Sequence, residues 1–289
     1  MNDTAPRMGR KGYFAMSQCD HQCGSCGSQD CAERAFTKDP LNEFSSVKKV
    51  IGVVSGKGGV GKSLVTGLLA SRMQASGAHA AVMDADLTGP TIPRLFGLDE
   101  RMLGSDEGLE PARSATGVDI VSMNLILENA TDPVIWRGSV IANVVRQFWT
   151  DVVWRDVDYM FIDMPPGTGD VPLTVYQSLP IDGIVIVTSP QELVSMIVEK
   201  AVNMAQLDGI NVPVIGLVEN MSYFECAKCG ERHAIFGESH LEDIARQYGI
   251  PNVARLPIDP SIARSCDAGA IEAVQSPWLD AMADAIAKL

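Results

Sequence analysis

A glycine-rich loop with two lysines is the part of the sequence whose residue types and spacing most clearly indicate a chemistry. It reads Gly56-Lys57-Gly58-Gly59-Val60-Gly61-Lys62-Ser63 and fits the pattern G-x-x-x-x-G-K-[ST]. Glycines let backbone N–H groups turn inward around phosphate oxygens, and the N-terminus of a following helix adds partial positive charge. The pattern predicts that Lys62 reaches the terminal phosphates of a nucleotide and that the Ser63 hydroxyl binds Mg²⁺.

Carboxylates that follow two apolar runs are suited to hold the Mg²⁺ shell of such a site. Asp163 follows Tyr159–Ile162 and precedes a loop rich in glycine and proline. Asp84 and Asp86 follow Ala80–Met83. The pattern alone does not choose between Asp84 and Asp86.

Two of the seven cysteines form a C-x-x-C motif, Cys226-Ala227-Lys228-Cys229. An odd number of cysteines in a reducing compartment argues for metal or redox chemistry rather than a disulfide framework. Two thiolates cannot complete a four-ligand site, but two chains related by a two-fold axis supply four. The motif therefore predicts a symmetric dimer bridged by metal. The spacing alone equally fits half a zinc site with His233, or a redox dithiol.

A second group of thiols lies near the N-terminus, at Cys19, Cys23, Cys26 and Cys31. Four thiols within thirteen residues are enough for one complete metal site in one chain, with His21 as a spare ligand. The spacing is compatible with an iron–sulfur cluster, with zinc or with cargo in transit. Cys266 stands alone, and we expect it to be an ordinary residue.

The elements that position these groups follow from the hydrophobic pattern. Short β-branched runs alternate with helical patterns from Val47 onward, which is typical of an α/β fold with a largely parallel, doubly wound sheet covered by helices on both faces. Helices are expected over Leu64–Met73, directly after the loop, over Gln191–Leu207, and from Ser276-Pro277 to Leu289. The expected strands are Val50–Val54, Ala80–Met83, Tyr159–Ile162, Gly183–Thr188, Val214–Val218 and Val253–Leu256.

Composition divides the chain at about residue 46. Residues 1–46 contain no Val or Ile and a single Leu, so we expect a flexible, cysteine-rich metal-binding arm there and the nucleotide-binding domain over residues 47–289. The net charge of −13 argues against nucleic acid and anionic lipid as partners. The chain has no apolar run of about 20 residues and no secretory signal. We therefore expect a cytoplasmic protein without a membrane partner.

Several motifs, in order, resemble one family of nucleotide-binding proteins. Lys57 resembles the signature lysine in the deviant phosphate loop of the MinD/ParA/nitrogenase-iron-protein group of P-loop NTPases. Within that group the sequence is similar to the Mrp/ApbC family of ATPases that carry and insert iron–sulfur clusters. The similarity covers about residue 47 to the C-terminus and rests on Asp84–Pro93, Trp136-Arg137-Gly138, Asp163–Asp170, Val218–Tyr223 and the C-x-x-C motif.

This resemblance implies roles for individual residues. Lys57 and Lys62 would contact phosphate, Asp86 would orient the attacking water, and Asp163 with Ser63 would hold Mg²⁺. Asn220 would read adenine, and the segment with Pro257 and Asp259 would close over the base. The nucleotide-binding set comprises Gly56, Lys57, Gly58, Gly59, Val60, Gly61, Lys62, Ser63, Leu64, Asn220, Pro257 and Asp259.

The function implied by the resemblance is a slow, ATP-dependent iron–sulfur carrier or scaffold. Its cofactors would be ATP, Mg²⁺ and a [4Fe–4S] cluster that bridges a homodimer at Cys226 and Cys229, and apo-proteins would accept the cluster. Other iron–sulfur scaffold ATPases also carry an N-terminal four-cysteine arm. Three alternatives stay open: a MinD/ParA-like positioning ATPase, a zinc-binding P-loop regulator, and an electron-transfer partner like the nitrogenase iron protein. Turnover should be slow because no arginine finger is evident, with Arg137 as a weak candidate.

Overall fold

A computed structural model describes residues 37–87, 89–127, 138–190 and 194–289 of the chain. The chain separates into two units, residues 1–35 and 36–289, and the description below concerns the second unit. The cysteines at positions 19, 23, 26 and 31 therefore lie outside the described residues, as do Thr88, Trp136 and Arg137.

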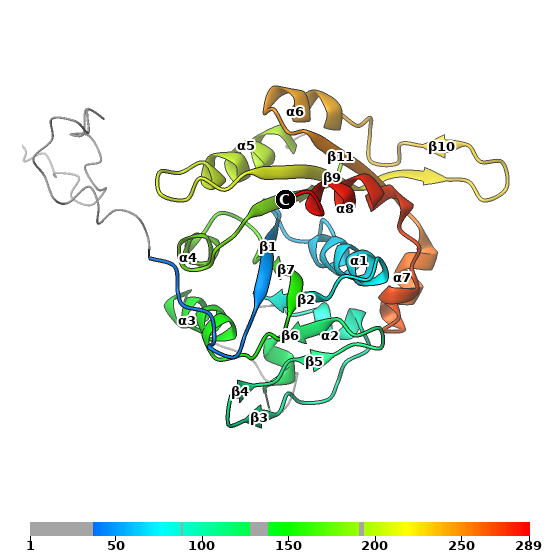
Figure 1. Cartoon of the computed structure of the whole chain (residues 1–289). Coiled ribbons are helices and arrows are strands. Elements are labelled where there is room, and N and C mark those ends of the chain that lie inside the picture. Colours follow the sequence, from blue (N-terminus) through cyan, green and yellow to red (C-terminus); the bar gives the residue numbers. More distant parts are fainter. Residues whose placement is uncertain (1–36, 88, 128–137, 191–193) are drawn as a thin grey trace, which may run out of the picture. The chain divides into compact units, whose positions relative to one another are not determined.

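Parallel strands form the centre of the second unit, with the order β11-β9-β8-β1-β7-β2-β6 (Figure 1). Antiparallel β5 extends this sheet beyond β6, and antiparallel β10 pairs with the C-terminal end of β9. Every residue of β2 and β8 is buried, as expected for strands covered on both faces. The strands are β1 (Val47–Val54), β2 (Ala80–Asp84), β3 (Gly104–Ser105), β4 (Gly108–Leu109), β5 (Ala112–Arg113), β6 (Asp119–Val121), β7 (Val157–Asp163), β8 (Gly183–Thr188), β9 (Val214–Glu225), β10 (Arg232–His233) and β11 (Asn252–Pro257).

Helices cover both faces of this sheet, which confirms the predicted doubly wound α/β architecture. In Figure 1, α1, α2, α7 and α8 lie on one side of the sheet and α3, α4 and α5 on the other. The α-helices are α1 (Lys62–Ala75), α2 (Ile92–Leu95), α3 (Gly138–Thr150), α4 (Asp170–Ser178), α5 (Val194–Ala205), α6 (Leu241–Gln247), α7 (Pro260–Asp267) and α8 (Asp280–Ile286). Short 3-10 turns occupy Met123–Leu125, Ile271–Ala273 and Pro277–Leu279.

The sheet register brings the predicted acidic residues together at one edge. Asp163 of β7 pairs with Val53 of β1 on one side and with Asp84 of β2 on the other. Because all three strands run in parallel, their carboxyl ends lie side by side, directly below the loop that joins β1 to α1. This edge of the sheet is where ligands bind in open α/β folds.

Strand β9 is longer than expected. The predicted strand, Val214–Val218, covers the first part of its parallel pairing, whereas the structure continues the strand to Glu225. Met221 has a left-handed backbone (φ 57°), Tyr223 beyond it still pairs with Pro257 of β11, and the last two residues of β9 pair with β10 as a hairpin. The prediction ended early because the later residues are polar or aromatic and break the apolar run.

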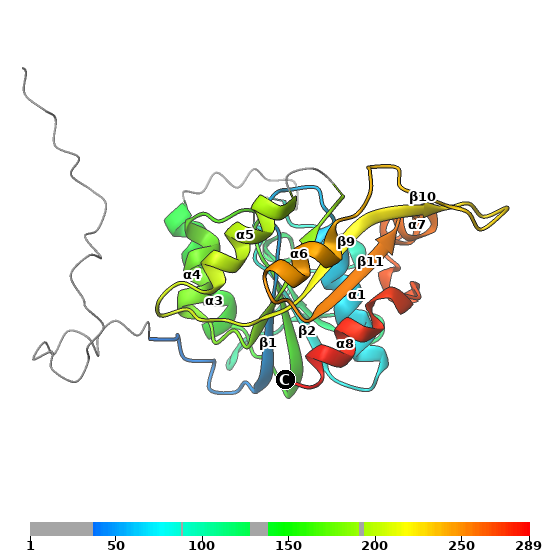
Figure 2. The same ribbon diagram turned by 90° about the horizontal axis from the view of Figure 1, so that it is seen from above.

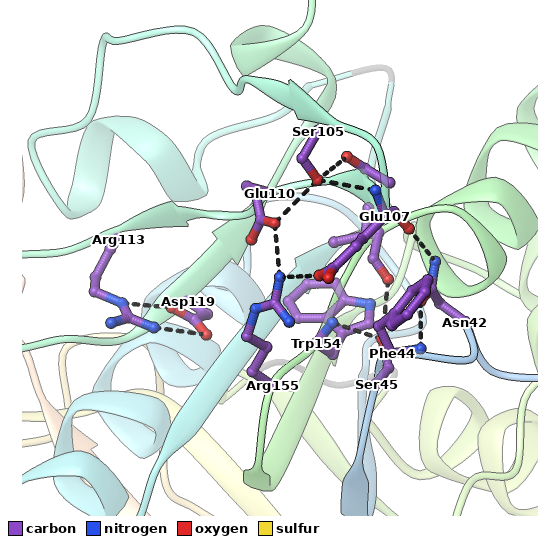
Figure 3. Close-up of polar contacts among 12 residues, drawn as sticks. Asn42, Phe44, Ser45, Ser105, Glu107, Glu110, Arg113, Asp119, Trp154 and Arg155 are labelled. Carbon is purple, nitrogen blue, oxygen red and sulfur yellow. Dashed lines mark hydrogen bonds and ion pairs between the residues drawn. The ribbon is translucent and has the colours of Figure 1, made fainter.

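Residues 37–46, assigned to the arm by composition, belong to the second unit and make contacts within it. Asn42 Nδ2 donates to the Glu107 carbonyl (3.2 Å), and the Trp154 N–H donates to Ser45 Oγ (2.7 Å). Figure 3 shows these contacts, together with the ion pair between Arg155 and the Glu107 carboxylate (2.5 Å). The boundary at residue 46 stays a prediction, and these contacts favour a boundary near residue 36.

Candidate functional site

The loop between β1 and α1 depends on glycine at defined positions. Gly59 and Gly61 have left-handed backbones (φ 82° and 86°), and Gly61 caps the N-terminus of α1. A Cβ at Gly61 would lie 2.1 Å from Asn220 Nδ2, and one at Gly56 would lie 2.2 Å from Ile197 Cγ2. The loop is therefore packed closely on β9 and α5 at its two ends, while Gly58 and Gly59 between them face open space.

Lys62, Ser63 and Asp163 converge below this loop. Lys62 Nζ lies 2.6 Å from Asp163 Oδ1, and Ser63 Oγ donates a 2.6 Å hydrogen bond to Asp163 Oδ2. Thr66 Oγ1, one turn further along α1, donates to Asp163 Oδ1 (2.9 Å). Asp163 is fully buried, so the ammonium and the two hydroxyls compensate its charge.

Asp84 and Asp86, which the sequence could not separate, occupy different environments. Asp84 is fully buried and accepts hydrogen bonds from Ser122 Oγ (3.0 Å) and from the Asp86 N–H (3.2 Å). Burial, followed by the nearby negative charge of Asp163, raises the pKa of Asp84 well above its usual value. The Asp86 carboxylate retains some solvent exposure and lies 3.8 Å from Lys62 Nζ. Of the two acids, Asp86 is the one that lies beside Lys62 and is also partly exposed to solvent.

The groups present fit a nucleotide phosphate with a divalent cation. The buried Lys62 ammonium makes no hydrogen bond of regular geometry among the described residues, although it pairs with Asp163. It lies at the first position of α1, where free backbone N–H groups favour an anion. Ser63 Oγ and the Asp163 carboxylate are oxygen donors of the kind that Mg²⁺ prefers, and they already face each other.

The residues assigned to the base lie in two separate places. Asn220 Nδ2 donates to the Val60 carbonyl of the loop (3.0 Å), and its Oδ1 accepts from the Met221 N–H (2.9 Å). Pro257 ends β11, and Asp259 caps α7 by accepting from the Ser261 N–H (2.7 Å). Both border a cleft of about 610 Å³ beside β9, which Asn220 does not line. The structure thus puts Asn220 against the phosphate loop rather than opposite Asp259.

The C-x-x-C motif lies at the tip of the β9–β10 hairpin. The Cys226 N–H donates to the Glu231 carbonyl (2.9 Å), and the Gly230 N–H donates to the Cys226 carbonyl (2.8 Å), with Gly230 in a left-handed conformation. Hydrogen bonds from the backbone N–H groups of Cys229 and Lys228 lower the pKa of the Cys226 thiol. Cys229 is exposed and Cys226 is partly exposed.

Over the described ranges, no three His, Cys, Asp or Glu side chains are grouped so that they could hold a metal. His233 Nε2 lies 3.9 Å from Glu231 Oε2 and does not join Cys226 and Cys229 in one site. Among the described residues of the hairpin, Cys226 and Cys229 are therefore the two candidate metal ligands.

Two hydroxyl residues in the site were not identified from the sequence. Thr66 stands three residues after Ser63 on α1, a spacing that places both on one helix face and that could have indicated it. Ser122, which donates a hydrogen bond to Asp84, comes after the short strand β6 and carries no comparable signal.

None of the described helices is long and apolar enough to cross a membrane.

Comparison with known proteins identifies relatives over most of the chain. Residues 46–289 match the ParA family model described as "NUBPL iron-transfer P-loop NTPase". The iron-sulfur cluster carrier protein of Clostridium perfringens is 41% identical over 268 residues, covering 86% of this chain and 93% of that protein. The protein of the same name from Methanocaldococcus jannaschii is 39% identical, with 88% and 90% covered.

Solved structures agree with the fold. A nucleotide-binding protein from Archaeoglobus fulgidus in complex with ADP is 43% identical, has a TM-score of 0.74, and covers 81% of this chain and 91% of its own. The cell division ATPase MinD of Pyrococcus furiosus has a TM-score of 0.57 at 17% identity, with 83% and 97% covered, and this likeness concerns the fold alone.

Proposed function

The chain belongs to the NUBPL iron-transfer P-loop NTPases of the ParA family, and from this premise we propose that it is an ATP-dependent carrier of iron–sulfur clusters. Relatives about 40% identical bear the name iron-sulfur cluster carrier protein. We further propose a [4Fe–4S] cluster as the cargo, Mg²⁺ as the metal of the nucleotide site, and a homodimer as the working form. The free thiols require a reducing compartment, for which we propose the cytoplasm.

In the proposed nucleotide site, Lys62 binds the terminal phosphates, and Ser63 and Asp163 hold Mg²⁺. The metal, when bound, neutralises charge that develops on the phosphate oxygens. Asp163 also fixes the position of Lys62, since the two are 2.6 Å apart in a buried setting. Leu64 and the loop residues before it supply backbone N–H groups at the start of α1.

The remaining assignments concern the attacking water and the base. We assign Asp86 to orient the water, because it is the partly exposed acid beside Lys62. Lys57 is assigned to phosphate, and Pro257 and Asp259 to the wall around the base. Asn220 Nδ2 donates to the Val60 carbonyl, so an Asn220 that reads adenine would exchange this hydrogen bond for one to the base.

Strand β9 is the single observation on which the coupling of ATP to cargo rests. Asn220, which holds the phosphate loop, and Cys226, at the start of the C-x-x-C motif, are six positions apart on one continuous segment. A change in the contacts of Asn220 would therefore act on the same segment that carries the thiols. In this proposal, ATP binding and hydrolysis alter the contact between two copies of the hairpin and so release the cluster to an apo-protein acceptor.

The test combines metal analysis with transfer. Iron, acid-labile sulfide, zinc and solution mass would be measured on anaerobically prepared wild type and on the double variant Cys226→Ser/Cys229→Ser. We expect near-equal iron and sulfide in a wild-type dimer, and loss of the dimer together with part of the iron in the variant. The iron that remains would belong to the arm with Cys19, Cys23, Cys26 and Cys31.

Transfer to an apo-ferredoxin would be followed with and without ATP, in wild type and in Lys62→Ala. We expect ATP to change the transfer rate in wild type only, because the variant lacks the phosphate-binding cation. Equal, ATP-insensitive rates in both proteins would refute the coupling. Zinc without sulfide would refute the cluster and favour a zinc-binding regulator instead.

A further inference from the structure

An unusual turn follows the cysteine hairpin. The Gly237 N–H donates to the Ala234 carbonyl (3.2 Å), which closes a four-residue turn with Ile235 and Phe236 at its two central positions. Such positions are normally filled by Gly, Pro, Asn, Asp or Ser. Here they hold two large apolar side chains that are 57% and 50% exposed. Adjacent exposed apolar groups of this size indicate a surface that another molecule covers.

The turn lies close to the thiols. In the β9–β10 hairpin, Arg232 pairs with Glu225 and His233 pairs with Phe224, and the turn begins at the next residue. At about 3.3 Å per residue, the turn is only about 10 Å along the hairpin from Cys226. The hairpin extends away from the sheet (Figures 1 and 2), and residues 227–238 are all exposed. A second hairpin that completes the ligand set at the thiols is therefore long enough to reach the turn as well.

Charge favours a second copy as the source of that hairpin. The chain carries a net charge of −13, so two copies repel each other over most of their surfaces. Residues 223–237, however, contain two acidic and two basic residues and have no net charge. Within this segment, Arg232 pairs with Glu225 (2.7 Å) and stacks on the Tyr223 ring (4.5 Å). The hairpin thus carries no net charge, and two acidic chains can approach each other closely there.

We propose that Ile235 and Phe236 form an apolar seal against a second copy of this chain, around the cluster shared by the two hairpins. This inference rests on the proposed function, because it takes the two-chain cluster as its starting point. A two-fold contact is self-complementary, so both turns are buried together. The seal adds apolar contact area to the iron–thiolate bonds, and it limits the access of water and chelators to the cluster.

The experiment replaces both side chains by serine in the full-length protein. Ile235→Ser/Phe236→Ser would be prepared in a background in which serine replaces Cys19, Cys23, Cys26 and Cys31, so that all bound iron reports on Cys226 and Cys229. The proteins would be reconstituted anaerobically. Sedimentation would give the dimer dissociation constant, and iron capture by a ferrous chelator would give the cluster lifetime.

We expect the double variant to dimerise about tenfold more weakly or worse, and to lose iron several times faster, since two half-exposed apolar side chains no longer become buried. Thermal unfolding of the metal-free variant should match that of the metal-free parent, because both side chains are exposed. Leu103→Ser/Leu207→Ser is the matched control: both leucines are exposed (73% and 48%) and lie outside the hairpin. Ile235→Leu/Phe236→Leu should retain the parent values.

An unchanged dimer constant and iron-loss rate in the serine variant would overturn the seal while leaving the carrier function intact. A variant impaired only in delivery to apo-ferredoxin would also overturn it, because the turn would then contact the acceptor. A parent protein that takes up no iron and sulfide, or stays monomeric when loaded, would refute the proposed function itself and the seal with it.

Discussion

Gly61 is under two independent constraints, one in its backbone and one in the space around it. Its φ of 86° is unfavourable for residues with a Cβ, and that atom would lie 2.1 Å from Asn220 Nδ2. The pattern G-x-x-x-x-G-K-[ST] requires this glycine, but the sequence does not reveal that a residue 159 positions later makes it indispensable.

Gly61→Ala should therefore destabilise the nucleotide-free protein, by about 1–3 kcal/mol, in addition to weakening nucleotide binding. The measurement is urea-induced unfolding without nucleotide. Gly58→Ala is the matched control from the same loop, because a Cβ there meets nothing within 4 Å, and we expect a change within about 0.5 kcal/mol. Equal effects of the two substitutions would show that neither the backbone nor Asn220 constrains position 61.

The site was predictable where a motif fixes residue identity and unpredictable where packing decides. Lys62, Ser63 and Asp163 were predicted from the motif and from the position of Asp163 at a strand end. In the structure, Lys62 Nζ and Ser63 Oγ each lie 2.6 Å from an oxygen of the Asp163 carboxylate. The sequence could not distinguish Asp84 from Asp86, because the burial of Asp84 depends on the register of β2 and on the position of Ser122 in the structure. The position of Asn220 against Val60 could not be inferred, since it depends on how the loop packs on β9.

At the scale of elements, uniform burial made strands predictable. The expected strand Gly183–Thr188 agrees with β8, all of whose residues are buried. The helix expected over Gln191–Leu207 is described from Val194 to Ala205, and residues 191–193 lie outside the description. The short strands β3 to β6, with two or three residues each, leave no periodic signal. Helix α3 was missed although its apolar residues follow a helical period, because no cap or strand signal marked its start.

The start of the second unit is clamped to two helices. Asp39 forms a bidentate ion pair with Arg146 of α3 (2.5 and 2.7 Å), and its carbonyl accepts from Trp149 Nε1 (3.0 Å). The Asp39 N–H donates to the Ser178 carbonyl at the end of α4 (2.8 Å). Helix α4 begins at Asp170, after the loop that follows Asp163, and ends at Ser178. The contacts of Asp39 therefore tie the start of the second unit to the C-terminal end of a helix whose N-terminal end lies near the candidate nucleotide site.

Asp39→Asn should lower the free energy of unfolding by about 1–2 kcal/mol at neutral pH, because the partly exposed Arg146 loses a charged acceptor. The hydrogen bond and the charge of Arg146 lower the pKa of Asp39 below 3.8. The stabilisation is therefore present above pH 3.8 and is lost as the pH falls through the lowered value. Unfolding curves of wild type and variant, measured from pH 7 downward, should converge in that acidic range.

Arg94→Ala provides the comparison for this clamp. Arg94 pairs with Asp267 at 3.4 Å, but both side chains are 75% exposed, so its loss should leave stability and pH dependence unchanged. A difference between wild type and Asp39→Asn that persisted at acidic pH would assign the effect to lost packing rather than to the ion pair.

At the scale of the whole molecule, charge is distributed unevenly with respect to the proposed dimer contact. The chain as a whole carries −13, whereas residues 223–237 are neutral. Long-range repulsion between the remaining acidic surfaces therefore opposes association of two copies through the neutral hairpin. This repulsion is screened by salt, whereas apolar contact and iron–thiolate bonds depend on salt far less.

Raising the salt concentration should accordingly strengthen the cluster-loaded dimer. Between about 20 and 200 mM KCl the Debye length falls from about 20 to 7 Å, so most repulsion between the two chains is removed. We expect the dimer dissociation constant, measured by sedimentation of the reconstituted protein, to fall several-fold over this range. Cys226→Ser/Cys229→Ser should remain monomeric throughout, because the two apolar side chains of the seal are too small a contact to hold two copies together without the iron–thiolate bonds. A loaded dimer that weakened as salt was added would instead indicate that ion pairs between the copies dominate the contact, and the neutral hairpin would not be its centre.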